Sequence, residues 1–123
     1  MEFIEAPAFT RYLSRYLNDE AYRELQSKLA VNPDLGDVMP GTAALEKYAG
    51  LTHIAARAAR GGLRIIYCHF RSDNQIWLVT LYNKNEASDL TAGEKKALKA
   101  AVEKETEIRA RLRRAGDRQR RTQ

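Results

Sequence analysis

Cysteine is almost absent from this sequence, because Cys68 is the single example among 123 residues. One cysteine cannot form a disulfide within the chain, which is typical of proteins in a reducing compartment. Apolar residues never run together for the roughly 20 positions that a membrane-spanning helix requires. The first ten residues carry Glu2 and Glu5 and lack the basic start of a secretory signal. We therefore expect a cytoplasmic protein with no membrane segment.

Grouped metal ligands are also missing. The chain has two histidines and one cysteine, and no cluster of carboxylates accompanies them. We therefore expect neither a metal site nor a cofactor. His53 and His69 have an ordinary pKa of about 6.5 that would suit acid–base chemistry, but we interpret both as surface residues. We expect Cys68 to pack inside a strand.

Positive charge is unevenly distributed along the chain. The whole chain has a net charge of +5, whereas residues 109–123 contain seven arginines and one aspartate and carry +6. Residues 1–108 therefore sum to −1. The high pI belongs to the carboxyl-terminal segment, which is either the solvated end of a helix or a surface that contacts RNA or an acidic partner.

The N-terminal third predicts a strand and a helical hairpin. Polar and apolar residues alternate over residues 2–5, as in an edge strand, and Pro7 favours the start of a helix. We expect a second helix with Asp19 as its N-cap, ending at Asn32-Pro33 because the residue before proline disfavours helical geometry. The apolar positions of the two helices recur every three or four residues: Phe9, Tyr12, Leu13, Tyr16, Leu17, Tyr22, Leu25, Leu29 and Ala30.

The remainder predicts a sheet and a last helix. Residues 63–71 and 76–82 are rich in β-branched and aromatic side chains and are separated by turn residues, which predicts an antiparallel hairpin of central strands. Residues 44–48 are a possible further strand. Thr91 followed by Glu94 predicts a capping box at the start of a helix. The apolar stripe of that helix consists of Leu98, Ala101, Val102, Ile108 and Leu112.

These elements predict a single α+β domain over residues 1–115. We expect an antiparallel sheet packed by the N-terminal helical hairpin, with a C-terminal helix in addition. Apolar residues stop beyond Ala115-Gly116. We therefore expect residues 116–123 to form a basic, flexible tail.

Four segments of the chain together carry a family resemblance: residues 20–26 (Glu-Ala-Tyr-Arg-Glu-Leu-Gln), 32–42 (Asn-Pro-Asp-Leu-Gly-Asp-Val-Met-Pro-Gly-Thr), 60–67 (Arg-Gly-Gly-Leu-Arg-Ile-Ile-Tyr) and 82–91 (Tyr-Asn-Lys-Asn-Glu-Ala-Ser-Asp-Leu-Thr). In order and spacing they resemble the HigB-type toxins of the RelE superfamily, which belong to bacterial type II toxin–antitoxin systems. The resemblance covers about residues 1–105. It implies a RelE-like fold with a concave basic surface that cuts mRNA in the ribosomal A site without a metal. It also implies a cognate antitoxin, often a helix-turn-helix protein, that keeps the toxin inactive.

RNA can be cleaved without a metal because each 2′-hydroxyl lies beside its own phosphate. The reaction needs a group that accepts the 2′-proton, cations that offset charge on the phosphorane, and an acid for the departing 5′-oxygen. Arginine suits the cationic role because its guanidinium stays charged and binds phosphate oxygens bidentately. Lysine or tyrosine could transfer protons if its pKa were shifted from about 10.

The resemblance assigns individual residues to these roles. Arg64 matches the arginine that precedes the Ile-Ile-Tyr strand of the family, and we expect it to bind the phosphate in the transition state. Lys84 matches a Lys-Asn-Glu signature with Tyr82 close before it, and both are further catalytic candidates. A competing interpretation pairs Arg64 with Glu86. The expected RNA-binding residues are Lys47, Arg57, Arg60, Tyr67 and Asn85.

The chain departs from the family pattern at two positions. Relatives commonly carry arginine where this sequence has Glu46 and Ala49. An acid within the expected RNA surface would repel phosphate. Cleavage would then depend on the arginines around Arg64, or the chain would be a weakened or non-cutting module that binds an antitoxin, a regulator or the ribosome. A third possibility is a nucleic-acid-binding protein that works through its arginine-rich tail.

Overall fold

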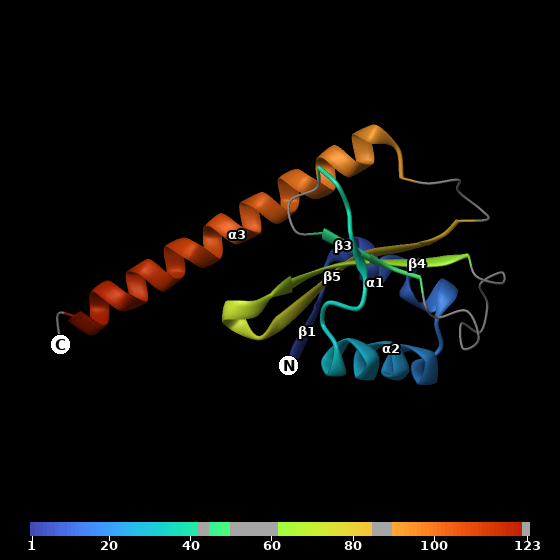
Figure 1. The fold of residues 1–123 in the computed structure, drawn as a ribbon, viewed down its shortest axis with the longest axis horizontal. Helices are drawn as coiled ribbons and strands as arrows, with labels where there is room; N and C mark the ends of the chain where they lie inside the picture. Colours follow the sequence, from blue (N-terminus) through green and yellow to red (C-terminus); the bar gives the residue numbers. More distant parts are fainter. Residues whose placement is uncertain (42–44, 50–61, 85–89, 122–123) are drawn as a thin grey trace.

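Two long antiparallel strands, β4 (Leu63–Phe70) and β5 (Gln75–Asn83), lie at the centre of a five-stranded sheet (Figure 1). The computed structural model describes residues 1–41, 45–49, 62–84 and 90–121. The strand order is β1-β5-β4-β3-β2. The outer strands are β1 (Glu2–Glu5), β2 (Asp37–Val38) and β3 (Leu45–Tyr48).

The sheet is mixed. The antiparallel pairing that we predicted holds for β2 through β5, whereas β1 lies parallel to β5, with Glu2 opposite Gln75 and Glu5 opposite Leu78. Alternating polarity identifies a strand, but it contains no information about the partner strand or its direction. The α+β class and the edge position of β1 are confirmed, and the expectation of a wholly antiparallel sheet is wrong at β1.

The helical hairpin covers one face of the sheet. Helix α1 (Pro7–Tyr16) begins with proline at its first turn, as predicted, and α2 (Asp19–Val31) ends before Asn32. The N-cap of α2 is Asn18, whose Oδ1 accepts a hydrogen bond from the Ala21 N–H at 2.8 Å, so our choice of Asp19 was one residue too late. Both residue types can cap a helix. The core on this face includes Phe9, Leu25, Leu29, Ile65, Tyr67, Ile76 and Leu78.

Helix α3 (Ala92–Arg121) covers the opposite face with its first half and then extends beyond the sheet (Figure 1). The predicted capping box is confirmed, because the Glu94 N–H donates to Thr91 Oγ1 and the Thr91 N–H donates to Glu94 Oε1, each at 3.1 Å. Val102 packs on the sheet with Leu45, Ile66, Cys68 and Val79. None of the helices in the described ranges combines the length and the apolar character needed to cross a bilayer.

The second half of α3 differs from our prediction in two respects. The helix continues through Gly116 to Arg121, past the position where we expected it to end. Ile108 is 39% exposed and Leu112 is 67% exposed, so the predicted apolar stripe is not buried this far along. The reason is that this part of the helix extends beyond the sheet. The division into a domain of residues 1–115 and a separate tail stays a prediction.

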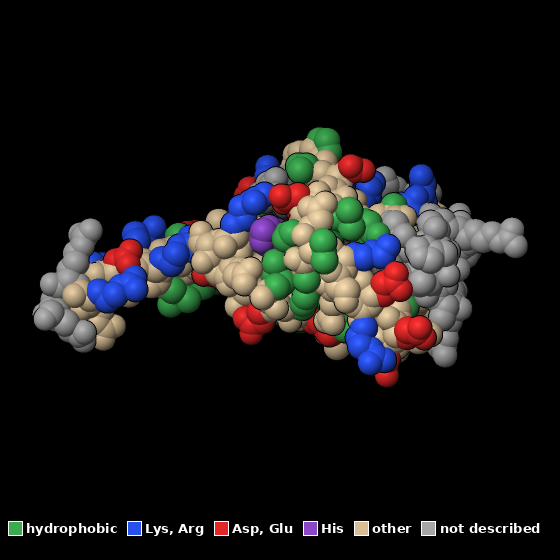
Figure 2. Space-filling model, turned by 60° about the horizontal axis from the view of Figure 1, so that its bottom comes forward, with side chains coloured by type: hydrophobic (Ala, Val, Ile, Leu, Met, Phe, Trp, Pro, Cys, Tyr) green, Lys and Arg blue, Asp and Glu red, His purple; other side chains and the backbone are tan. Residues whose placement is uncertain are grey.

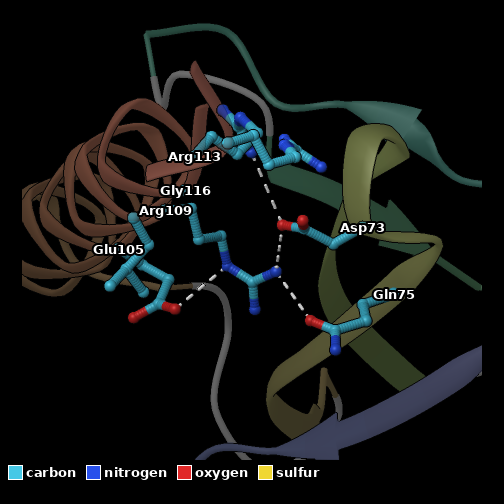
Figure 3. Close-up of a pocket in the computed structure, with 8 residues that line it drawn as sticks. Asp73, Gln75, Glu105, Arg109, Arg113 and Gly116 are labelled. Atoms are coloured by element: carbon cyan, nitrogen blue, oxygen red, sulfur yellow. Dashed lines mark hydrogen bonds and ion pairs between the residues drawn. The ribbon is translucent and has the colours of Figure 1, made fainter. Parts of the chain in front are cut away.

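Arg109 joins α3 to the tip of the β4–β5 hairpin (Figure 3). Its guanidinium donates hydrogen bonds from Nη1 to Asp73 Oδ2 at 2.7 Å and to Gln75 Oε1 at 2.6 Å, and from Nε to Glu105 Oε1 at 3.0 Å. The guanidinium carbon also lies 3.9 Å from the centroid of the Phe70 ring. The side chain is only 12% exposed. A nearly buried cation with this many partners determines where the helix crosses the hairpin.

Replacement of Arg109 by alanine should lower the free energy of unfolding by about 2–3 kcal/mol, because it removes the ring contact and leaves Asp73 without its principal cation. Urea unfolding measures this loss. Arg111→Ala is the matched control on the same helix, since its pair with Glu107 at 2.6 Å is exposed to solvent and contributes little to stability. Equal losses in the two variants would contradict the role of Arg109.

Candidate functional site

Arg64 and Tyr82 are register partners on the two central strands. Side chains of directly paired residues lie on the same face of a sheet. Tyr82 packs against the core beneath α3, whereas Leu63 and Ile65, on either side of Arg64, belong to the core beneath the helical hairpin. Arg64 and Tyr82 therefore share the α3 face. Arg64 is half-buried, and its Nη1 donates a hydrogen bond to the Leu63 carbonyl at 3.1 Å.

Two lysines lie near this pair. Lys47 on β3 is opposite Ile66, which places it on the same face as Arg64. The exposed Lys84 follows β5, and its backbone N–H donates to the Gly62 carbonyl at 2.6 Å, one step beyond the end of the β4–β5 ladder. The structure thus brings Arg64, Tyr82, Lys47 and Lys84 to one region of the sheet.

A hollow of about 500 Å³ lies beside Tyr82, between α1 and α3. It opens where β1 has ended, because β1 pairs with β5 only as far as Leu78. Arg11 and Arg15 contribute basic groups to its wall. Its other lining residues include Tyr12, Thr80, Leu90, Glu94 and Leu98. This hollow gives the α3 face a mixed wall of aromatic, apolar and cationic groups next to the Tyr82 ring.

Tyr67 does not belong to this site, and our expectation that it contacts RNA is wrong. The side chain is fully buried on the face of the sheet that α1 and α2 cover, which we call the hairpin face. Its hydroxyl donates to the Pro33 carbonyl at 2.9 Å and accepts from the Gly36 N–H at 2.8 Å. Burial raises the pKa of Tyr67 well above its usual value. A Cβ atom at Gly36 would lie 3.0 Å from the Tyr67 ring, so the close approach of this turn requires glycine.

Glu46 also faces away from Arg64. It is opposite Tyr67 in the β3–β4 register and is 7% exposed on the hairpin face. Burial raises the pKa of Glu46 to about 7, the charge of Asp34 acts in the same direction, and Arg71 opposes them. The expectation that Glu46 places an acid within the Arg64 surface is therefore wrong. The sheet separates the two side chains.

His69 is not the surface residue that we expected. It lies close to Asp34, whose charge also acts on Glu46. Its side chain is 10% exposed, and its Nδ1 lies 3.9 Å from Asp34 Oδ1 without a hydrogen bond. Burial and the nearby Arg71 lower the pKa of His69, against the opposite influence of Asp34. Arg71 binds both carboxylate oxygens of Asp34, at 2.8 and 2.7 Å. The sequence gives no signal for this cluster, because Asp34 comes from a loop, Glu46 and His69 from two different strands, and Arg71 from the turn between β4 and β5.

Three expected RNA-binding residues, Arg57, Arg60 and Asn85, lie outside the described residues, as do His53 and Glu86. Cys68 is buried as predicted, and burial raises its pKa to about 11. Within the described ranges, histidine, cysteine and carboxylate side chains do not gather in a group of three or more that could hold a metal ion.

Comparison with solved structures shows a structural likeness. No protein-family model matches the chain. The chain is similar to a solved structure of a mutant of the E. coli toxin RelE in the free state. The TM-score is 0.49, the sequence identity is 11%, and the match covers 71% of this chain and 86% of that chain.

Replacement of Glu46 by glutamine tests the burial of this carboxyl. Because its pKa is about 7 in the folded chain and near 4.5 when unfolded, the folded state holds the extra proton. Wild-type stability should therefore be fully present below pH 4.5 and fall as the pH rises through 7. Glutamine stays neutral, so its advantage in urea unfolding should grow from near zero at pH 4.5 to at most about 3 kcal/mol at pH 8.5.

His69 titrates in both of these proteins, so their difference isolates Glu46. The control is Glu24→Gln, which removes a half-exposed carboxylate 3.9 Å from Lys28 Nζ on the same helix and should leave the free energy of unfolding nearly unchanged. Parallel pH profiles for wild type and Glu46→Gln would show that folding does not raise the pKa of Glu46.

Proposed function

We propose that this chain is the toxin component of a type II toxin–antitoxin system and a metal-independent endoribonuclease that cuts mRNA in the ribosomal A site. One observation carries the proposal: Arg64 and Tyr82 are paired across the central strands on the face opposite Glu46. The four ordered segments that resemble HigB-type toxins support it independently. The acid that seemed to conflict with RNA binding lies on the other side of the sheet.

In the proposed reaction, the Arg64 guanidinium binds the non-bridging oxygens of the scissile phosphate. The 2′-oxygen attacks phosphorus and loses its proton to a base, and Arg64 offsets the negative charge that builds up on the phosphorane. The bond from phosphorus to the 5′-oxygen then breaks, and an acid protonates the leaving group. Tyr82 and Lys84 are the candidates for these two proton transfers, while Lys47 holds the RNA backbone on the same face.

The proposed partners follow from the resemblance. They are mRNA in the ribosomal A site and a cognate antitoxin, which we expect to be a helix-turn-helix protein. Arg57, Arg60 and Asn85 stay predicted RNA contacts. Ala49, where relatives carry arginine, favours the competing proposal of a non-cutting RelE-like module that binds an antitoxin, a regulator or the ribosome. Mapping of mRNA ends after induction of the chain separates the two, because only the nuclease creates new ends.

Arg64→Ala should lower the rate of mRNA cleavage on ribosomes by about 10²–10³, the usual cost of losing one group that stabilises transition-state charge. The control is Arg71→Ala, which removes an exposed arginine next to the far end of the same strand and should cleave normally. Undiminished cleavage by Arg64→Ala would remove this residue from the mechanism. An equal loss of cleavage in both variants would show that cleavage depends on the total positive charge and not on Arg64 in particular.

A pair of tyrosine variants separates chemistry from folding. Tyr82→Phe keeps the ring but removes the hydroxyl, so it should slow cleavage by at least about tenfold if that oxygen transfers a proton. Tyr67→Phe loses two buried hydrogen bonds and should cost about 1–3 kcal/mol in urea unfolding while the folded protein cleaves normally. Wild-type cleavage by Tyr82→Phe would leave Lys84 as the remaining candidate.

A further inference from the structure

The part of α3 beyond Arg109 is a second basic feature, separate from the Arg64 region. We call residues 110–121 the basic arm. The arm starts at the β4–β5 hairpin tip, where Arg109 binds Asp73, and projects away from the body (Figures 1 and 2). Arg64 lies near the start of β4, at the other end of that strand from the tip. The two features are therefore at opposite ends of the central hairpin.

One face of the basic arm is directed at the tip of the β4–β5 hairpin, and another face is exposed. Arg113 Nη1 lies 3.6 Å from Asp73 Oδ2, so this arginine lies on the face directed at the hairpin, like Arg109. Leu112 and Gly116 line the hollow beside Arg109. The apolar part of the arm thus faces the body or the space next to it.

The other face carries Arg111, Arg114 and Arg118. They are spaced by three and four residues, which places them in one row on a helix, and all three are exposed. Glu107 confirms the row, because a hydrogen bond from Arg111 at 2.6 Å and the nearby charge of Arg114 lower the pKa of Glu107. The row spans about 10 Å of helix.

We propose that this row binds the phosphate backbone of structured RNA. Guanidinium groups bind phosphate oxygens bidentately, and a straight row of exposed cations fits a polyanion that repeats its charge every few ångströms. A protein partner would need apolar or aromatic anchors within the contact. The row itself has none, and the exposed Leu112 lies about a quarter turn away from Arg111, beside the hollow next to Arg109. Charge complementarity therefore favours RNA over an acidic protein surface.

The inference does not rest on cleavage at Arg64, and its test is done with that site disabled. The probe is a fluorescent RNA hairpin with a stem of about 20 base pairs, titrated with the full chain carrying Arg64→Ala at several salt concentrations. The test variant adds Arg111→Gln, Arg114→Gln and Arg118→Gln. The control adds Lys96→Gln, Lys99→Gln and Lys104→Gln, which remove the same charge from exposed positions on the earlier part of α3.

The arm variant should bind the RNA hairpin at least about tenfold more weakly than its parent near 0.1 M salt. The slope of its log affinity against log salt concentration should be smaller by about two to three. The control should stay within about threefold of the parent. Glutamine is a good helix former, so circular dichroism should show an intact α3 in both. Equal affinity in the arm variant and its parent, or equal losses in both variants, would overturn the proposal. Tighter binding of polyglutamate of matched charge than of RNA would overturn it in favour of an acidic protein.

Discussion

The register of β4 against β5 is the constraint on which the rest of the molecule depends. A slip of one residue would transfer every side chain of β4 to the other face. In the observed register Arg64 is opposite Tyr82 and Ile66 is opposite Thr80, and the register then shifts between Ile66 and Tyr67. Residues on both sides of this irregularity stay buried between the two helical layers. Packing on both faces fixes the register, and the register fixes what each face can do.

The two faces consequently have different electrostatic characters. The hairpin face holds Glu46 with its raised pKa, the poorly solvated His69 and the Arg71–Asp34 pair. The α3 face holds the paired Arg64 and Tyr82. A carboxylate on the same face as a phosphate-binding site would weaken phosphate binding. Glu46 lies on the other face of a packed sheet, and its carboxyl is only partly ionised near neutral pH, so it weakens phosphate binding little. An acid at position 46, where HigB-type toxins commonly carry arginine, is therefore compatible with the cleavage that we propose for the α3 face.

Much of the fold could be predicted from the sequence, because its local signals are strong. The turn at residues 72–75, the start of α1 at Pro7 and the Thr91 capping box each depend on neighbouring residues only. The errors arose where a decision depends on tertiary structure. The odd spacing of Arg64 and Tyr67 already places them on opposite faces of a strand, but both central strands are nearly continuously apolar, so the pattern could not show that the Tyr67 face is fully covered. The distal part of α3 lacks an apolar stripe, but arginine, alanine and glutamate favour helix, and pairs such as Glu107–Arg111 stabilise it without burial.

The projecting helix also gives the molecule a pronounced electric dipole. Residues 1–108 have a net charge of −1, whereas residues 109–123, most of which form the projecting part of α3, carry +6. A molecule of this kind turns in the field of a polyanion before it touches it, so collisions become biased toward one orientation and association is faster at low ionic strength. The body, whose net charge is close to zero, would then arrive second and from a restricted range of directions.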